Sequence, residues 1–181
     1  MKLKQVTKNV LISIIIGILL GVITEYALIL NISWLIQITQ SFLFWGLIIC
    51  ITVLVSKDFS FSIINPIIVI SLMNITYYLI RLLMSGYTNF GGLELYTFTG
   101  IAGAIYIGTI IYLIKNKFIY HRSKGIPQMY YLIIMTIIGI IFTKIGYSFP
   151  INHNLAYNMD LGIIIGFVIG IILVKILKKI Q

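Results

Sequence analysis

The chain has 181 residues, of which 60% are hydrophobic and 9% are charged, and its mean hydropathy is +1.10. A soluble domain keeps about a quarter of its residues charged to cover a wet surface, so this composition excludes an ordinary soluble protein. The net charge is +9, but the basic residues stand in short runs beside apolar segments, which excludes nucleic acid as the partner. We expect one transmembrane domain over residues 1–181 with the lipid bilayer as its main contact.

Six apolar windows are long enough to cross the hydrocarbon core, which takes about 20 residues each. The first window follows a basic start, as in a signal peptide, but it is too long and lacks a small-residue cleavage site, so we expect it to be retained. Pro66 is expected in the first turn of the third helix, where a missing N–H costs nothing. The sequence predicts an all-α bundle of six transmembrane helices near Asn9–Leu30, Trp34–Val55, Ser62–Leu83, Glu94–Ile114, Gln128–Ser148 and Asp160–Leu177.

The basic residues predict the orientation of this bundle. With six helices drawn, eleven of the 13 Lys and Arg residues fall on one side, and only Arg81 and Lys144 lie near the other. Because Lys and Arg accumulate in cytoplasmic loops, we expect both termini in the cytoplasm. The abundance of Ile, Asn, Lys and Tyr resembles the codon bias of an AT-rich bacterium. The predicted location is therefore the bacterial cytoplasmic membrane, with a multi-pass topology.

The third predicted helix carries a polar stripe made of Asn74, Tyr77, Tyr78 and Arg81. Their spacing of i, i+3, i+4 and i+7 puts all four on one face of the helix. One interpretation is a binding surface inside the bundle. The other is that Arg81 reaches the headgroups and the tyrosines form an interfacial belt. Asn74 favours the first, because it lies deeper and needs a polar partner.

Four further charged residues lie in the outer half or at the outer ends of the predicted helices: Glu25, Glu94, Lys144 and Asp160. Charges within membrane helices usually face the bundle, where they pair or line a wet cavity. The alternatives are ion pairs that fix helix order and, for Glu94 and Asp160, acids that complement a helix dipole. Glu25, with apolar residues on both sides, is the strongest functional candidate. We predict a ligand-binding site built from Glu25, Asn74, Tyr77, Arg81, Glu94 and Lys144.

The outer half of the second predicted helix adds Gln37, Gln40, Ser41 and Trp45 on roughly one face, with Trp34 nearby. Aromatic rings, amides and charges of both signs suit a small polar or zwitterionic ligand. The same residues equally suit an interfacial belt around a satisfied polar core.

Small residues form ladders at a spacing of four on three of the predicted helices. Gly17 and Gly21 lead to Glu25 on one face of the first, Gly100, Ala104 and Gly108 lie on the fourth, and Gly162, Gly166 and Gly170 lie on the last. Such ladders let helix backbones approach closely. They predict either packing within the chain or docking of a membrane partner subunit.

Motifs of catalysis and cofactor binding are missing from the sequence. There is no H-E-x-x-H, no glycine-rich phosphate loop and no paired glutamates of an intramembrane protease. The single cysteine, Cys50, excludes a cysteine metal site, and His121 and His153 are predicted on opposite sides of the membrane. We assign no catalytic residue, no metal and no cofactor.

The predicted outline resembles the substrate-binding S components of energy-coupling-factor transporters. The shared features are six helices in about 180 residues, both termini inside, a small-residue ladder on the first helix and a polar outer cavity. The resemblance implies that Gly17 and Gly21 dock a shared transmembrane subunit and that a solute binds near the outer surface. The family's docking motif is usually Ala-x-x-x-Ala, whereas this chain has Gly17-x-x-x-Gly21.

Three hypotheses about function follow. The first is a small-solute binding or transport subunit with an outward-facing polar site. The second is a membrane scaffold or accessory subunit that uses its glycine ladders for assembly and its basic inner face for anionic lipid or a cytoplasmic partner. The third is an intramembrane enzyme that uses Glu25 or Asp160 as a general base on a lipid-linked substrate.

Overall fold

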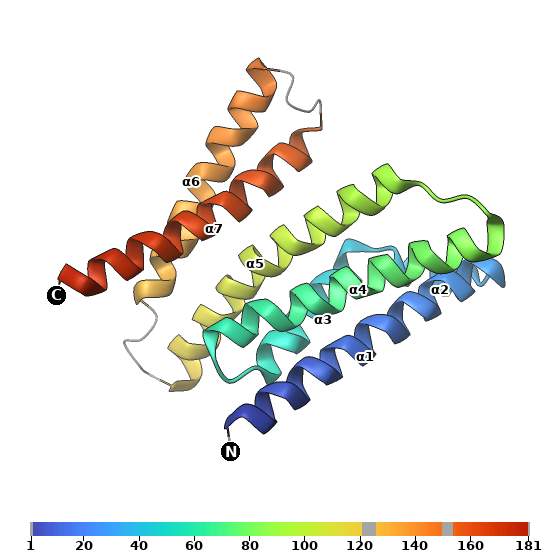
Figure 1. Cartoon of the computed structure of the whole chain (residues 1–181), viewed down its shortest axis with the longest axis horizontal. Helices are drawn as coiled ribbons and strands as arrows, with labels where there is room; N and C mark the ends of the chain where they lie inside the picture. The colour runs from blue at the N-terminus through green and yellow to red at the C-terminus, as the bar shows by residue number, and fades with distance from the viewer. Residues whose placement is uncertain (1, 121–125, 150–153, 181) are drawn as a thin grey trace.

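A computed structural model describes residues 2–120, 126–149 and 154–180, and all regular elements in these ranges are α-helices. His121 and His153 lie outside the described residues. In Figure 1, α1 begins and α7 ends toward the same end of the bundle, and α6 and α7 form a hairpin beside the other helices. The helices are α1 (Lys2–Ile29), α2 (Ser33–Thr39), α3 (Phe42–Val55), α4 (Phe59–Ser85), α5 (Phe90–Tyr120), α6 (Ile126–Ser148) and α7 (Leu155–Ile180).

The described helices have the length and composition of a multi-pass membrane protein. Five of them are long and apolar enough to cross a bilayer, and the pair α2 and α3 makes a sixth span if it is counted as one. Large apolar side chains lie on the outside of the bundle, for example Leu43, which is 81% exposed. Lipid tails are the solvent that such a surface requires.

The second predicted helix is not continuous, so the prediction of one helix over Trp34–Val55 is wrong. The chain bends by 57° between α2 and α3. Ser41 has an extended backbone and caps α3, because its Oγ accepts a hydrogen bond of 3.2 Å from the Phe44 N–H. The indole Nε1 of Trp45 donates to the Thr39 carbonyl at the end of α2 over 3.3 Å. These two bonds satisfy backbone groups that a break in a membrane helix would otherwise leave unpaired.

Several helices also extend beyond their predicted ends. Pro66 lies inside α4 rather than in its first turn. A proline there leaves the Ser62 carbonyl without its helical donor, and Gly108 of α5 packs so closely that a Cβ on it would lie 3.0 Å from that oxygen. Neither Glu94 nor Asp160 lies in the first turn of its helix, so the prediction that they open helices is wrong.

Small residues set the contacts between neighbouring helices. On α1, a Cβ at Gly17 would lie 2.7 Å from the Val69 carbonyl of α4, and one at Gly21 would lie 2.5 Å from the Met73 carbonyl. The contacts advance along both helices together, so α1 and α4 run parallel. The stripe on α7 packs equally closely against α6 through Gly162, Gly166 and Gly170, but in the antiparallel direction.

The core lies along α4 and α5. One cluster of buried side chains joins Ile48 of α3 to Val69 and Met73 of α4, and a second joins α3, α4 and α5 through Ile70 and Ala104. α5 also packs against both helices of the α6–α7 hairpin. The C-terminal half of α4 and the N-terminal part of α5 lie beside α1, α2 and α3, and these segments together build the site.

Candidate ligand-binding site

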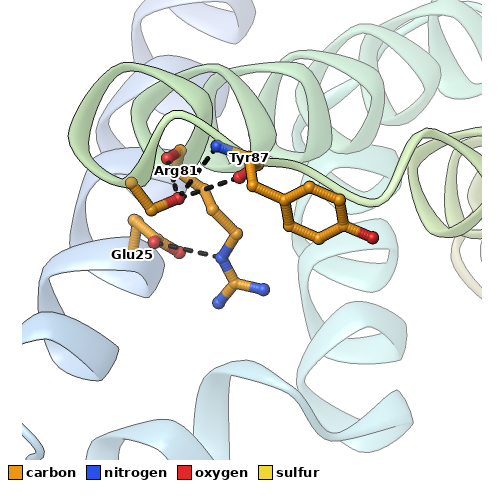
Figure 2. Close-up of polar contacts among 4 residues, drawn as sticks. Glu25, Arg81 and Tyr87 are labelled. Carbon is orange, nitrogen blue, oxygen red and sulfur yellow. Dashed lines mark hydrogen bonds and ion pairs between the residues drawn. The ribbon is translucent and has the colours of Figure 1, made fainter.

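An ion pair joins Glu25 of α1 to Arg81 of α4, with 3.2 Å between Oε1 and Nε (Figure 2). The Glu25 side chain is 6% exposed and that of Arg81 is 34% exposed. A carboxylate this well buried needs a partner in a membrane protein, because an unpaired charge there is costly. The pair arises because Gly21, one turn before Glu25, brings α1 against α4.

The end of α4 is fixed just beyond Arg81. Gly86 has a φ of 69° and closes the helix, a conformation that glycine adopts without steric cost. The Ser85 hydroxyl lies 2.7 Å from the Arg81 carbonyl and 2.8 Å from the Tyr87 carbonyl (Figure 2). These hydrogen bonds fix the last turn of α4, which begins just after Arg81.

The Arg81 guanidinium also stacks on an aromatic ring. Its Cζ lies 4.7 Å from the centre of the Tyr77 ring, which is within the range of a cation–π interaction. Tyr77 in turn contacts Tyr78 edge to face, with the ring centres 4.8 Å apart. Within the described part of the chain, Nε of Arg81 bonds Glu25 while the terminal nitrogens donate to no acceptor.

A cavity of about 380 Å³ lies at this end of the bundle. Its volume falls in the range of small-molecule sites. The wall is drawn from α1, α4, α5 and the break between α2 and α3, which opens the space that a continuous helix would fill. The lining residues are Thr24, Thr39, Gln40, Phe42, Trp45, Met73, Asn74, Tyr77, Tyr78, Arg81 and Tyr96.

Asn74 is a buried polar side chain of this wall whose hydrogen bonding is incomplete. It is 4% exposed, and its Nδ2 has no acceptor among the described residues. The hydroxyls of Thr24 and Thr39 are occupied, because they donate to the Leu20 and Leu35 carbonyls of their own helices over 2.8 and 2.9 Å. Buried amide N–H groups are rarely left unpaired. Glu25 Oε2 and Asn65 Oδ1 also have no partner among the described residues, but of these three residues only Asn74 lines the cavity.

The structure brings together some of the predicted site residues and separates others. Asn74, Tyr77 and Arg81 line the cavity as their helical spacing predicts, and Glu25 stands behind Arg81. Glu94 and Lys144 are exposed and lie off the cavity wall, and the described residues place neither in an ion pair. Asp160 is buried elsewhere, where its Oδ2 accepts a 2.7 Å hydrogen bond from Thr99 Oγ1.

The sequence analysis missed five lining residues: Thr24, Thr39, Phe42, Met73 and Tyr96. Tyr96 carried a usable signal, since it precedes the buried Gly100 by four residues and so lies on the same face of α5. The threonines carried none, because each hydroxyl bonds its own helix and would do so in any membrane helix. Met73 was visible only as an apolar residue next to Asn74.

Known proteins give no guide to the function of this site. No protein family, curated protein or solved structure matches this chain. Over the described residues there is no group of three or more His, Cys, Asp or Glu side chains able to hold a metal ion. Any functional assignment therefore depends on the cavity, its donors and its aromatic wall.

Proposed function

We propose that this chain is a small-solute binding or transport subunit of the bacterial cytoplasmic membrane. It crosses the membrane six times, with α2 and α3 as one broken span and both termini in the cytoplasm. The solute enters the cavity from the outer side. Asn74, Tyr77 and Arg81 contact it, Glu25 positions Arg81, and Glu94 and Lys144 take no part.

One observation carries this proposal: the Asn74 amide is buried in the cavity wall and has no acceptor among the described residues. An unsatisfied buried amide costs about 1–3 kcal/mol. A bound solute that offers an acceptor would remove this cost. A purely structural polar stripe would more simply hold a partner supplied by the chain itself.

The outward opening follows from the predicted topology together with the helix directions. α1 and α4 run parallel, and Glu25 and Arg81 both lie near the C-terminal ends of these helices. With the basic N-terminus held inside, these ends reach the outer side. The cavity then faces the compartment from which a bacterium takes up solutes.

The scaffold and enzyme hypotheses receive less support from the geometry. The glycine face of α1 is covered by α4, so Gly17 and Gly21 do not present an open surface to a partner. Glu25 is bound to Arg81, and Asp160 accepts a hydrogen bond from Thr99. Glu25 and Asp160 are both outside the set of residues that line the cavity.

Equilibrium dialysis of the purified protein in lipid nanodiscs against a bacterial metabolite extract tests the proposal. Solutes retained by the protein are identified by mass spectrometry. We expect at least one solute to be retained by the wild type and lost from Asn74→Leu, because the leucine removes the amide donor and fills the wall.

Asn65→Leu is the matched control for this experiment. Asn65 is also a buried asparagine of α4, but its Nδ2 donates to Ser56 Oγ over 3.1 Å, and it does not line the cavity. This variant should retain the same solute as the wild type. If no solute distinguishes the wild type from Asn74→Leu while both unfold at similar temperatures, the proposed function is wrong.

A further inference from the structure

The guanidinium of Arg81 is held in one orientation by two contacts. Glu25 occupies its Nε, and the Tyr77 ring lies against its face. Figure 2 shows the two terminal nitrogens pointing away from the Glu25 carboxylate. The edge that remains carries parallel N–H groups, which is the geometry that binds a planar carboxylate through two hydrogen bonds. Because the side chain is already fixed, little conformational freedom is lost when an anion binds.

Two polar groups of the wall that lack an acceptor among the described residues are donors. The Arg81 guanidinium only donates, and the unpaired atom of Asn74 is the donor Nδ2. Gln40 and the tyrosines of the wall can donate or accept, so a ligand that pairs with both Arg81 and Asn74 must supply acceptors. The single negative charge of Glu25 balances the single positive charge of Arg81, so a ligand with one negative charge disturbs the charge balance of the site less than a phosphate monoester, which carries about −1.5 to −2.

The space between the two donors is aromatic. Asn74 and Arg81 are two helical turns apart, about 10 Å along the axis, and Tyr77 and Tyr78 lie between them on α4. Opposite them, Trp45 and Tyr96 meet edge to face with 6.2 Å between ring centres, and the Trp45 N–H is already used by Thr39. The rings thus offer apolar surface for the body of a ligand.

We infer that the solute is a small monocarboxylate with an apolar or aromatic body. Its carboxylate binds the terminal nitrogens of Arg81, its body lies between the rings of Tyr77, Tyr78, Trp45 and Tyr96, and a second acceptor at its far end reaches Asn74. This inference rests on the proposed function and specifies the ligand class of the same cavity.

A paired panel of probes tests the ligand class. The protein in nanodiscs is dialysed against phenylalanine, leucine, 3-phenylpropionate and nicotinate, and separately against the primary amide of each acid. Choline, thiamine and uridine serve as cationic and neutral probes. We expect at least one acid to be retained at least about tenfold more tightly than its amide, because the amide cannot form the charged, two-bond contact. Retention of both phenylalanine and 3-phenylpropionate would show that the carboxylate, and not the amine, is recognised.

Two variants locate the contact. Arg81→Lys keeps a cation for Glu25 but lacks the planar fork, so it should weaken binding of the retained acid about tenfold or more. Asn74→Asp keeps the side-chain volume and puts a carboxylate where the second acceptor binds, so it should do the same. Lys144→Gln, which changes a cation away from the cavity, should leave binding unchanged. If Arg81→Lys does not fold, Asn74→Asp still decides the matter.

Three results would overturn the inference. They are retention of no acid in the panel, equal retention of an acid and its amide, and binding that neither variant weakens. Retention of choline, thiamine or uridine instead, lost in Asn74→Leu, would overturn the carboxylate while the proposed function stands. If the metabolite extract also yields no solute sensitive to Asn74→Leu, both proposals fail.

Discussion

Two cations of this bundle, Lys115 and Arg81, lie at opposite ends of α3 and meet very different surroundings. The Nζ of Lys115 is within hydrogen-bond distance of three backbone carbonyls at the end of α3: Val53 at 3.4 Å, Leu54 at 2.7 Å and Ser56 at 2.6 Å. An ammonium has three donors, so this cation is saturated by the chain. Arg81 has five donors and gives one of them to Glu25.

The difference shows which property of a charged residue points to a ligand. Lys115 ties α5 to the end of α3, where orphan carbonyls need donors. Arg81 is equally well positioned, by Glu25 and Tyr77, but most of its donors have no acceptor among the described residues. For recognising a ligand-binding residue in a membrane helix, the presence of a charge is therefore less informative than the number of hydrogen-bond donors on it that have no acceptor.

Removing the Arg81 cation should have the largest effect. Arg81→Met leaves Glu25 buried without its partner and should lower the free energy of unfolding by about 3 kcal/mol, measured by SDS titration in mixed micelles. The double variant Glu25→Gln/Arg81→Met should recover most of that stability without recovering solute binding. If the double variant is as unstable as Arg81→Met, the stability lost in Arg81→Met does not come from an unpaired Glu25. Lys144→Met, on an exposed part of α6, is the control.

A change at Gly21 tests whether the close approach of α1 to α4 is what positions Glu25 against Arg81. The methyl group of Gly21→Ala would lie 2.5 Å from the Met73 carbonyl and 2.7 Å from Thr76 Cβ. Overpacking of this kind should cost about 2 kcal/mol and, by moving Glu25 away from Arg81, should weaken solute binding. Gly46→Ala on α3 meets nothing within 4 Å and is the matched control. Equal stability of the two alanine variants would contradict the close packing.

Removing the saturated cation should have the smallest effect of the three. Lys115→Met deprives the end of α3 of its donors and should lower the free energy of unfolding by about 1 kcal/mol, with the affinity for solute unchanged. Lys175→Met, on an exposed part of α7, should alter neither quantity. A loss of solute binding in Lys115→Met would break the distinction between a structural and a ligand-binding cation.

The positions of most helices could be predicted because a membrane span requires a long apolar run, and such runs are visible in any sequence. The break between α2 and α3 could not. Apolar residues continue on both sides of Gln40 and Ser41, and the bonds that stabilise the break come from Phe44 and Trp45 in the next helix. Pro66 was misplaced because the apolar window began later than the helix does.

The site was partly predictable for a similar reason. The spacing of Asn74, Tyr77 and Arg81 fixes a common face whatever the neighbours are, and a buried Glu25 requires a cation near it. Glu94 and Lys144 form an acid and a base like Glu25 and Arg81. Near a helix end, however, a charged side chain can reach water, so the sign of its charge does not predict that the side chain turns toward the bundle interior. Which helix covers which face depends on packing between helices, and one sequence does not state it.

The separation of the two ion-pair partners along the chain also gives their assembly an order in time. Glu25 precedes Arg81 by 56 residues, and ribosomes add about 5–20 residues per second. The ribosome therefore makes Arg81 several seconds after Glu25. Because an unpaired carboxylate is costly in lipid, the first helix reaches its most favourable surroundings only once α4 has been made. The contact that orients Arg81 thus also stabilises the first helix in its final place.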